Sequence, residues 1–405
     1  MGSQEVISNL EKKLLVFYAA LANNYREKLI SNAELASFVL RVEEPNLLQQ
    51  LRLAEQQQDW AYAQAILQAL GDVYERWVRK PEFKSLRQRA LNQIGLHLAL
   101  AKAKGKDAFD FWMYLRGVDA NEAIESADLE TARVVYQEIL DELTALNDPS
   151  VNDKIAGVYH QLGIVAQEQR WFDEAIAFYH KSLQICEDVG DFYNAAKQYH
   201  NLGYIAQEQQ RFDEAIAFYH KALQILEDVG DFYKVASVYH NLGALAHKQQ
   251  RFDDAIAFYN KALKIREDAG DFRSAANQYQ GLGNIAKEQG DFDTAVAYFQ
   301  KAFTATSAVN DWRKASSTLT AWGRTLEIQS NWTEAVKIYI QALAIDIKHN
   351  SEFVRSDTNN LGRMLKQLVD SQFQEIWREL TGEECPGEVF SIIQKASETE
   401  EEGAD

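Results

Sequence analysis

Apolar side chains in the central part of the chain recur with the spacing of amphipathic helices. From Tyr199 onward, apolar and small residues follow the i, i+3, i+4, i+7 pattern of a helix with one buried face. A second stripe of the same period begins after Phe212, at Ala215, Ile216, Tyr219, Ala222 and Leu223. The pattern therefore predicts two antiparallel helices joined by a short turn.

This pair of helices is repeated along the chain. The segment YHNLGYIAQEQQRFDEAIAFYHKALQILEDVGDF begins at Tyr199, and close copies begin at Tyr159, Tyr239 and Tyr279. A weaker copy runs from Leu319, so the repeat has a period of 40 residues. A fixed period in this range is typical of stacked helical hairpins, and we expect an all-α solenoid.

Two positions of the repeat are notable: one holds glycine or asparagine, and the other holds glycine in every copy. The first follows the second helix of each pair, where a left-handed residue would end the helix, at Gly190, Gly230, Gly270, Asn310 and Asn350. The second lies inside the first helix, where each glycine costs ~0.5–1 kcal/mol relative to alanine. We expect these glycines to allow close approach to small residues of the second helix (Ala175, Ala215, Ala255, Ala295, Ala335); they are Gly163, Gly203, Gly243, Gly283, Gly323 and Gly362.

Together with its flanking segments, the repeat array divides the chain into four expected parts. We expect an N-terminal helical region with degenerate hairpins at 1–150, five repeats at 151–350, capping helices at 351–396 and an acidic tail at 397–405. In the first region, Pro45 and Pro81 each lie where a helix is expected to start, the position that tolerates proline.

The N-terminal segment has two interpretations. Lys12 and Lys13 precede nine apolar residues, and Ala20–Ala22 resembles a cleavage site, as in a signal peptide. Glu5 and Glu11 oppose that interpretation. Helical spacing instead favours an amphipathic helix with one apolar stripe, formed by Ile7, Leu10, Leu14, Phe17, Tyr18, Leu21 and Tyr25.

Charge and motifs exclude several classes of function. The 405 residues carry a formal charge of −18, which disfavours binding to nucleic acid phosphates. The two cysteines, Cys186 and Cys385, are too far apart in sequence for a CxxC site. The sequence contains no P-loop, no G-x-S-x-G and no HExxH motif. We therefore expect a cytoplasmic protein that is not an enzyme and has no cofactor, and we expect no membrane partner because no apolar run reaches ~20 residues.

The repeat motif, L-G-x-x-A followed by F-D-x-A and Y-x-x-A-L, resembles the tetratricopeptide repeat over about residues 155–346. The usual period of that repeat is about 34 residues, and the longer form here is similar to the repeats of kinesin light chains and spindle-orientation adaptors. The resemblance implies a right-handed α-solenoid that serves as a scaffold for protein–protein interaction.

The flanks resemble a second group of proteins. EEPNLLQQLRLAEQQQDW and IWRELTGEECPGEV are similar to segments around the tetratricopeptide arrays of bacterial, often cyanobacterial, signal-transducing STAND NTPases. This resemblance implies an alternative function in signalling, as the sensor segment of a larger P-loop NTPase that is truncated here.

Five histidines recur at intervals of 20 residues, from His160 to His240. Their regularity suggests a metal site, but they alternate between the first and second helix of each pair. Same-register residues of adjacent repeats also lie too far apart to share a zinc ion. We therefore expect no metal.

The tetratricopeptide resemblance implies a concave groove lined by the first helix of each pair. Side-chain amides such as Asn201 and Asn241 both donate and accept, so they match the main chain of an extended peptide. We expect the ligand to be a protein or peptide segment, neutral or basic, while intramolecular and homo-oligomeric contacts remain open. The predicted groove residues are His160, Gln161, His200, Asn201, Tyr204, His240, Asn241, His247, Gln280, Asn284 and Arg324.

Overall fold

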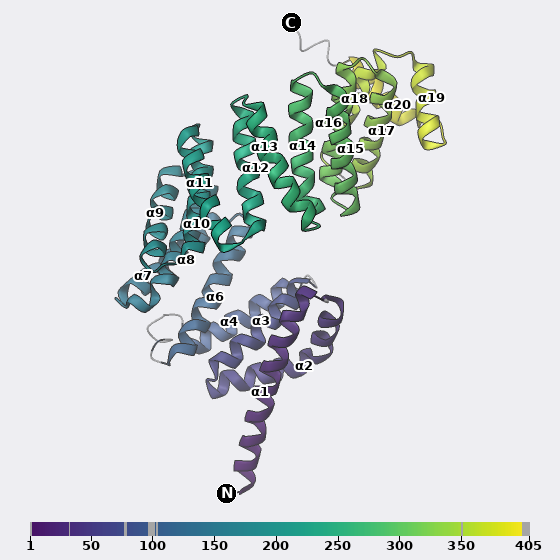
Figure 1. Ribbon diagram of the computed structural model, residues 1–405. Helices are drawn as coiled ribbons and strands as arrows, with labels where there is room; N and C mark the ends of the chain where they lie inside the picture. The colour runs from purple at the N-terminus through teal and green to yellow at the C-terminus, as the bar shows by residue number, and fades with distance from the viewer. Residues whose placement is uncertain are drawn as a thin grey trace. The chain divides into compact units, whose positions relative to one another are not determined.

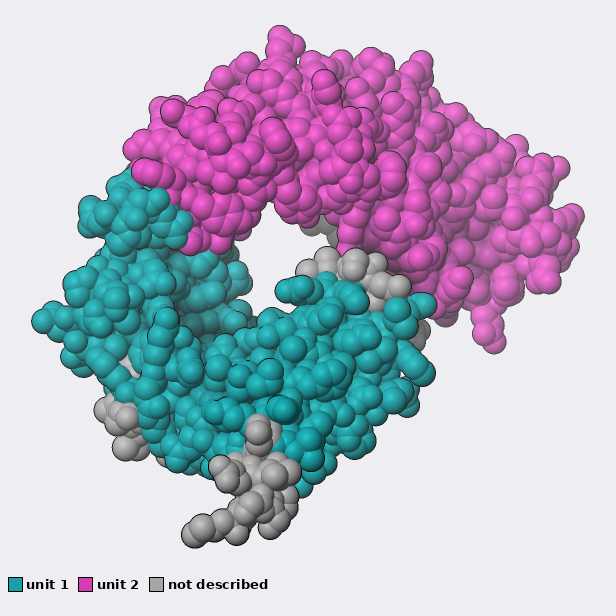
Figure 2. Space-filling model, turned by 60° about the horizontal axis from the view of Figure 1, so that its bottom comes forward, with its two compact units in different colours: residues 1–191 teal, residues 192–405 magenta. Residues whose placement is uncertain are grey.

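The computed structural model describes residues 2–31, 33–76, 79–95, 102, 104–349 and 351–398. All regular secondary structure in these residues is helical (Figure 1). The chain divides into two compact units, residues 1–191 and 192–405, coloured separately in Figure 2. This division differs from the four parts expected from sequence, whose boundaries remain predictions.

Unit 1 contains the N-terminal helices and the first full repeat. Its largest fully buried side chains include Trp112, Phe111 and Tyr74, which belong to one hydrophobic core. The elements are α1 (Gly2–Ser31), α2 (Ala33–Gln57), α3 (Trp60–Arg76), α4 (Lys80–Ile94), α6 (Lys106–Glu125), α7 (Leu129–Ala145), the 3-10 turn η1 (Pro149–Val151), α8 (Asn152–Glu168) and α9 (Phe172–Asp188).

The two prolines of this region have different positions. Pro81 lies in the first turn of α4, as predicted. Pro45 lies inside α2, so the prediction that a helix starts there is wrong. Helical spacing continues across the proline, because Leu40, Leu47 and Leu51 are all buried. We attribute the tolerance of Pro45 to this burial, which offsets the loss of one backbone hydrogen bond.

Helix α1 forms as expected, but it buries the predicted apolar stripe only in part. Leu15, Ala19 and Ala22 are buried, whereas Leu10 and Phe17 are more than half exposed. The side chain of Ile7 lies outside the described residues. Small alanines permit α1 to lie close to its neighbours. Tyr18, Leu21 and Tyr25 of the predicted stripe are partly buried against the core.

Unit 2 continues the repeat and ends in a cap. Consecutive helices from α10 to α17 form antiparallel hairpins, and each hairpin packs on the next, while the cap helices α18 and α19 both pack on α17. The elements are α10 (Phe192–Glu208), α11 (Phe212–Val229), α12 (Phe232–Lys248), α13 (Phe252–Asp268), α14 (Phe272–Glu288), α15 (Phe292–Ala308), α16 (Trp312–Ile328), α17 (Trp332–Lys348), α18 (Val354–Leu365), α19 (Asp370–Thr381) and α20 (Gly387–Glu398).

We call the first helix of each repeat the A-helix (α8, α10, α12, α14 and α16) and the second the B-helix (α9, α11, α13, α15 and α17). The predicted left-handed residues after the B-helices are confirmed at Gly190, Gly230, Gly270 and Asn310, with φ of 74°, 79°, 69° and 55°. Asn350 lies outside the described residues.

The mid-helix glycines accommodate aromatic rings, and the expectation that alanines face them is wrong. A Cβ added at Gly203 would lie 2.8 Å from Cδ1 of Tyr219, and one at Gly243 would lie 2.8 Å from Cδ1 of Tyr259. Because these rings are almost completely buried, the space above each glycine is occupied by the aromatic ring of the paired B-helix. The other repeats have the same contact, through Tyr179, Phe299 and Tyr339.

The C-terminal cap begins as a sixth A-helix. Gly362 of α18 has the register of the mid-helix glycines, but a Cβ there would meet the backbone of α20, 2.9 Å from the nitrogen of Ser397. Helices α19 and α20 therefore replace a B-helix, as the predicted capping pair does. Of the predicted acidic tail, residues 399–405 lie outside the described residues.

Candidate binding surface on the A-helices

All predicted groove residues lie on A-helices and outside the hydrophobic core. His160 and Gln161 belong to α8 in unit 1, and the other residues belong to unit 2. Arg324 is exposed and Tyr204 is 38% exposed, while the remaining residues are half-buried. Within unit 2, the surface is formed by α10, α12, α14 and α16.

Three of the A-helix histidines, His160, His200 and His240, each lie against the aromatic ring that covers a mid-helix glycine. The centroid of the His200 ring is 5.7 Å from that of Tyr219, and the His240 ring is 5.6 Å from that of Tyr259. In unit 1 the rings of His160 and Tyr179 are 6.0 Å apart. The glycine thus admits the tyrosine, and the tyrosine supports the imidazole.

Polar side chains of successive A-helices are connected to one another. The Asn241 amide nitrogen of α12 lies 2.8 Å from Nε2 of His200 on α10. One repeat further, the Gln278 amide nitrogen of α14 lies 3.2 Å from Nδ1 of His240. Two further contacts continue the series: Gln280 of α14 with Thr318 of α16, and Thr320 of α16 with Asp357 of α18. We call these four contacts the A-helix ladder.

Both ladder histidines are neutral at pH 7. Burial lowers the pKa of His200, a hydrogen bond with Asn201 raises it in part, and the charge of Lys234 lowers it further. Burial also lowers the pKa of His240, together with the charges of Lys314 and Arg266. A neutral ring nitrogen without hydrogen accepts from an amide, which fits the contacts with Asn241 and Gln278. Their protonation therefore lies below the ordinary histidine pKa of ~6.5.

The structure distinguishes residues that the sequence pattern treats as equivalent. Asn241 and Gln280 are engaged in the ladder, and Nε2 of His247 lies 3.1 Å from a carboxylate oxygen of Glu288. Asn201 instead lies beside His200 on its own helix. The predicted groove residues of unit 2 that lie outside the ladder and outside the contact of His247 with Glu288 are Asn201, Tyr204, Asn284 and Arg324.

Four members of the ladder are absent from the predicted groove residues: Gln278, Thr318, Thr320 and Asp357. Gln278 is only 2% exposed, and Asp357 only 1%. A polar residue at a register expected to be buried is the signal that identifies such positions, because buried polar groups need partners. His180 and His220 on the B-helices are exposed and belong to a different surface.

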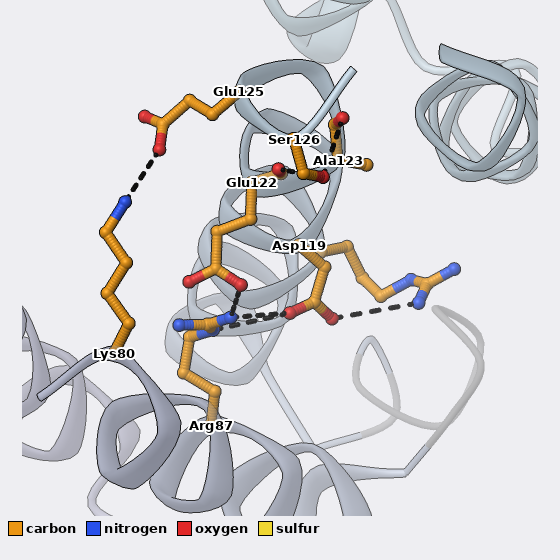
Figure 3. A network of polar contacts seen from close by, with 8 residues as sticks. Lys80, Arg87, Asp119, Glu122, Ala123, Glu125 and Ser126 are labelled. Atoms are coloured by element: carbon orange, nitrogen blue, oxygen red, sulfur yellow. Dashed lines mark hydrogen bonds and ion pairs between the residues drawn. The ribbon is translucent and has the colours of Figure 1, made fainter. Parts of the chain in front are cut away.

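A second polar site in unit 1 is a network of paired charges between α4 and α6 (Figure 3). The buried Arg87 guanidinium contacts Asp119 at 3.1 Å and Glu122 at 2.5 Å, and Lys80 contacts Glu125 at 3.1 Å. A cavity of about 240 Å³ adjoins it. Because each of these charges has an opposite partner, we interpret the network as a connection between the two helices.

The described residues contain neither a metal site nor a helix that could span a membrane. No three His, Cys, Asp or Glu side chains among them gather as a metal site requires. No helix in the described ranges combines the length and the apolar character needed to span a membrane.

Comparison with known proteins addresses the fold and the repeat. A signal transduction ATPase with numerous domains (STAND) from Pyrococcus horikoshii, which has a tetratricopeptide repeat sensor, matches with a TM-score of 0.59 and 15% identity. The match covers 88% of this chain and 55% of that protein, so the chain spans about half of its length. No curated protein matches the sequence.

Two further solved structures are similar. Apo RapI matches with a TM-score of 0.50 and 14% identity over 70% of this chain and 99% of that one. A putative kinesin light chain of Podosopora anserina with nearly identical TPR-like repeats matches with a TM-score of 0.43 and 13% identity, over 49% of this chain and 98% of that one.

Family models settle what the repeats are. Tetratricopeptide repeat models match residues 155–189, 193–268 and 272–348. These ranges coincide with the hairpins from α8 to α17 and with the predicted 40-residue period. The chain therefore carries tetratricopeptide repeats from residue 155 to residue 348, stacked as an α-solenoid.

Proposed function

We propose that the A-helix surface of unit 2 binds an extended segment of a protein partner, and that the chain acts as a cytoplasmic scaffold. Tetratricopeptide repeats generally mediate protein–protein interaction and are typically not catalytic. The observation that carries the proposal is the row of polar side chains that the A-helices present at one register, outside the core, on rigid supporting rings. Side chains held in this way lose little freedom when a ligand binds.

Asn201 and Asn284 are the amides that we expect to meet the main chain of the ligand. Both are half-buried and lie outside the ladder. Asn201 also hydrogen-bonds His200 of its own helix, but an amide has two donor hydrogens and an acceptor oxygen, so part of its capacity is left for a ligand. Tyr204 and Arg324, one helical turn beyond the ladder register, would contact ligand side chains. Asn241 supports the surface instead, because its amide nitrogen already contacts His200.

A neutral or basic segment is the ligand that we propose. The chain carries a net charge of −18, which attracts positive partners over long range. Lys234 and Lys314 lie close enough to His200 and His240 to lower their pKa, so beside these two histidines we expect a neutral residue of the ligand rather than a basic one. Long-range attraction predicts that binding of a basic segment weakens as salt concentration rises.

The test uses peptides of 12 residues selected from a random display library against the whole chain. Affinity is then measured by calorimetry for the wild type, Asn201→Ala and Asn284→Ala. Losing one hydrogen bond to a buried ligand group costs ~1–3 kcal/mol, so each variant should bind about tenfold more weakly. The double variant should lose more than either single variant.

The matched controls are His180→Ala and His220→Ala, which alter exposed polar residues of the B-helices. Their affinities should equal that of the wild type. A peptide whose binding ignores Asn201 and Asn284 but is lost in the B-helix variants would assign recognition to the other face.

A second candidate function is a sensor array in a larger STAND NTPase. One observation favours it: the structural match to the Pyrococcus horikoshii protein extends over 88% of this chain, flanks included. Sequencing the gene upstream of this chain tests it, because a P-loop module encoded in frame would support the sensor reading, and its absence would remove it.

A further inference from the structure

The helices α1 and α2 present large apolar side chains to solvent. Leu10 is 58% exposed, Phe17 56%, Phe38 63% and Val42 57%. Leu14 lies between Leu10 and Phe17 and is 40% exposed. We call these five residues the α1–α2 apolar face. Contiguous exposed apolar residues of this size mark interaction sites, since isolated ones carry no such meaning.

Both halves of this face lie on one side of the α1–α2 hairpin. The two helices pack against each other, and the Tyr18 hydroxyl of α1 donates to Glu43 of α2 at 3.3 Å. Phe17 and Val42 each precede a residue of this contact. A step of one residue turns a helix by ~100°. Because antiparallel axes turn in opposite senses, Phe17 and Val42 emerge on the same side.

The spacing of the face fits another helix. Leu10, Leu14 and Phe17 follow each other at intervals of four and three residues, and Phe38 and Val42 at an interval of four. This is the seam spacing of helices that pack side by side. Tyr18 and Leu21, which are partly buried against the core, form the floor between the two rows.

Charge distinguishes a second copy of this chain from other partners. Residues 1–57 contain six Lys or Arg and seven Asp or Glu, a net charge of −1, whereas the whole chain carries −18. Two copies can therefore bring this part together with little electrostatic repulsion. A twofold axis across an antiparallel hairpin generates a four-helix bundle, in which each row meets its counterpart.

We propose that the α1–α2 apolar face is a homodimer interface that joins two chains through a four-helix bundle. This interface lies on α1 and α2 and includes none of the predicted groove residues. The dimer would present two repeat arrays to a partner.

The test is the mass of the whole chain in solution from 1 to 100 µM, measured by sedimentation equilibrium. The wild type should shift from 46.2 kDa towards twice that mass as concentration rises. Phe17→Asp and Phe38→Asp should each raise the dissociation constant about tenfold or more, because each places a charge at the centre of the interface. Leu14→Ser is a milder variant that should weaken the dimer less.

The matched controls are Phe232→Asp and Phe272→Asp, which alter aromatic residues of similar exposure, 62% and 52%, in unit 2. They should dimerise like the wild type, and circular dichroism should show that all variants are folded. A wild type that stays monomeric to 100 µM overturns the proposal and leaves the face to another protein or to the rest of this chain. The proposal is also overturned if the control variants lose dimerisation to the same extent as Phe17→Asp and Phe38→Asp.

Discussion

At the scale of single residues, one contact supports both the packing and the candidate surface. The glycine inside each A-helix leaves space for a B-helix ring, and in the first three repeats the ring supports a histidine. Glycine is required there because a Cβ at Gly163 would lie 2.5 Å from Cε1 of Tyr179. The cost of glycine in a helix is thus offset by the burial of an aromatic side chain.

This contact predicts opposite effects for two alanine substitutions in α8. Gly163→Ala forces the buried Tyr179 ring to move and should lower the free energy of unfolding by ~1–3 kcal/mol. Gly157→Ala meets nothing within 4 Å, so it should raise that free energy by ~0.5–1 kcal/mol through better helix propensity. Urea unfolding of both variants measures the difference, and equal effects would refute the role of the ring.

At the scale of elements, the last repeat and the cap meet at two buried carboxyl groups. Asp346 of α17 and Asp357 of α18 are each 1% exposed. Ser316 donates to Asp346 at 2.6 Å, and Thr320 donates to Asp357 at 3.4 Å. Burial raises the pKa of Asp357 to about 8, and the hydrogen bond and repulsion from Asp346 act in the same direction. Below that pH the pair holds a proton, which lets both groups stay buried.

The pair predicts how docking of α18 depends on pH. The pKa of Asp357 is about 8 in the folded state, against ~3.9 when unfolded. The folded state therefore binds more protons at this group between these values, so the contribution of the pair to stability is full below about pH 4 and is lost as pH rises to about 8. Asp357→Asn should remove most of this decrease in stability with rising pH, because asparagine does not ionise.

Thermal unfolding of the wild type and Asp357→Asn at pH 5, 7 and 9 measures the effect. The control is Asp370→Asn, an exposed aspartate at the start of α19, which should leave the pH dependence unchanged. Parallel curves for the wild type and Asp357→Asn would show that the two carboxyl groups do not share a proton.

At the scale of the whole molecule, stability follows from contacts between neighbours. Helices of the repeats pack mainly on the helix before and the helix after them in the chain. In such an array each interior repeat is stabilised by its interfaces with two neighbours, whereas a terminal helix is stabilised by one interface. The cap helices α19 and α20 contain only 12 residues each.

Amide hydrogen exchange should therefore be slowest in α12–α15 and faster in α19 and α20. The physical reason is that opening a terminal helix breaks one interface, while opening an interior helix breaks two. Mass spectrometry of exchanged peptides measures this order. Equal protection from α12 to α20 would indicate that unit 2 opens as one block.

The sequence by itself determined the helices, their pairing and the period of the repeat. These features depend on local properties: apolar side chains at helical spacing, and residues such as Gly230 and Asn310 that adopt left-handed conformations at low cost. Repetition strengthened the prediction, because the same pattern occurs at the same register in successive copies. For the candidate surface, the sequence predicted only that it lies on the A-helices and which positions of the repeat contribute to it.

Only the tertiary structure decided which side chains meet. It placed tyrosines rather than alanines over the glycines, connected Asn241 but not Asn201 across adjacent helices, and left Phe17 at the surface. It also brought together Asp346 and Asp357, whose pairing no local pattern indicates. Helical periodicity shows which residues share a face, whereas the partner of that face depends on how neighbouring helices pack.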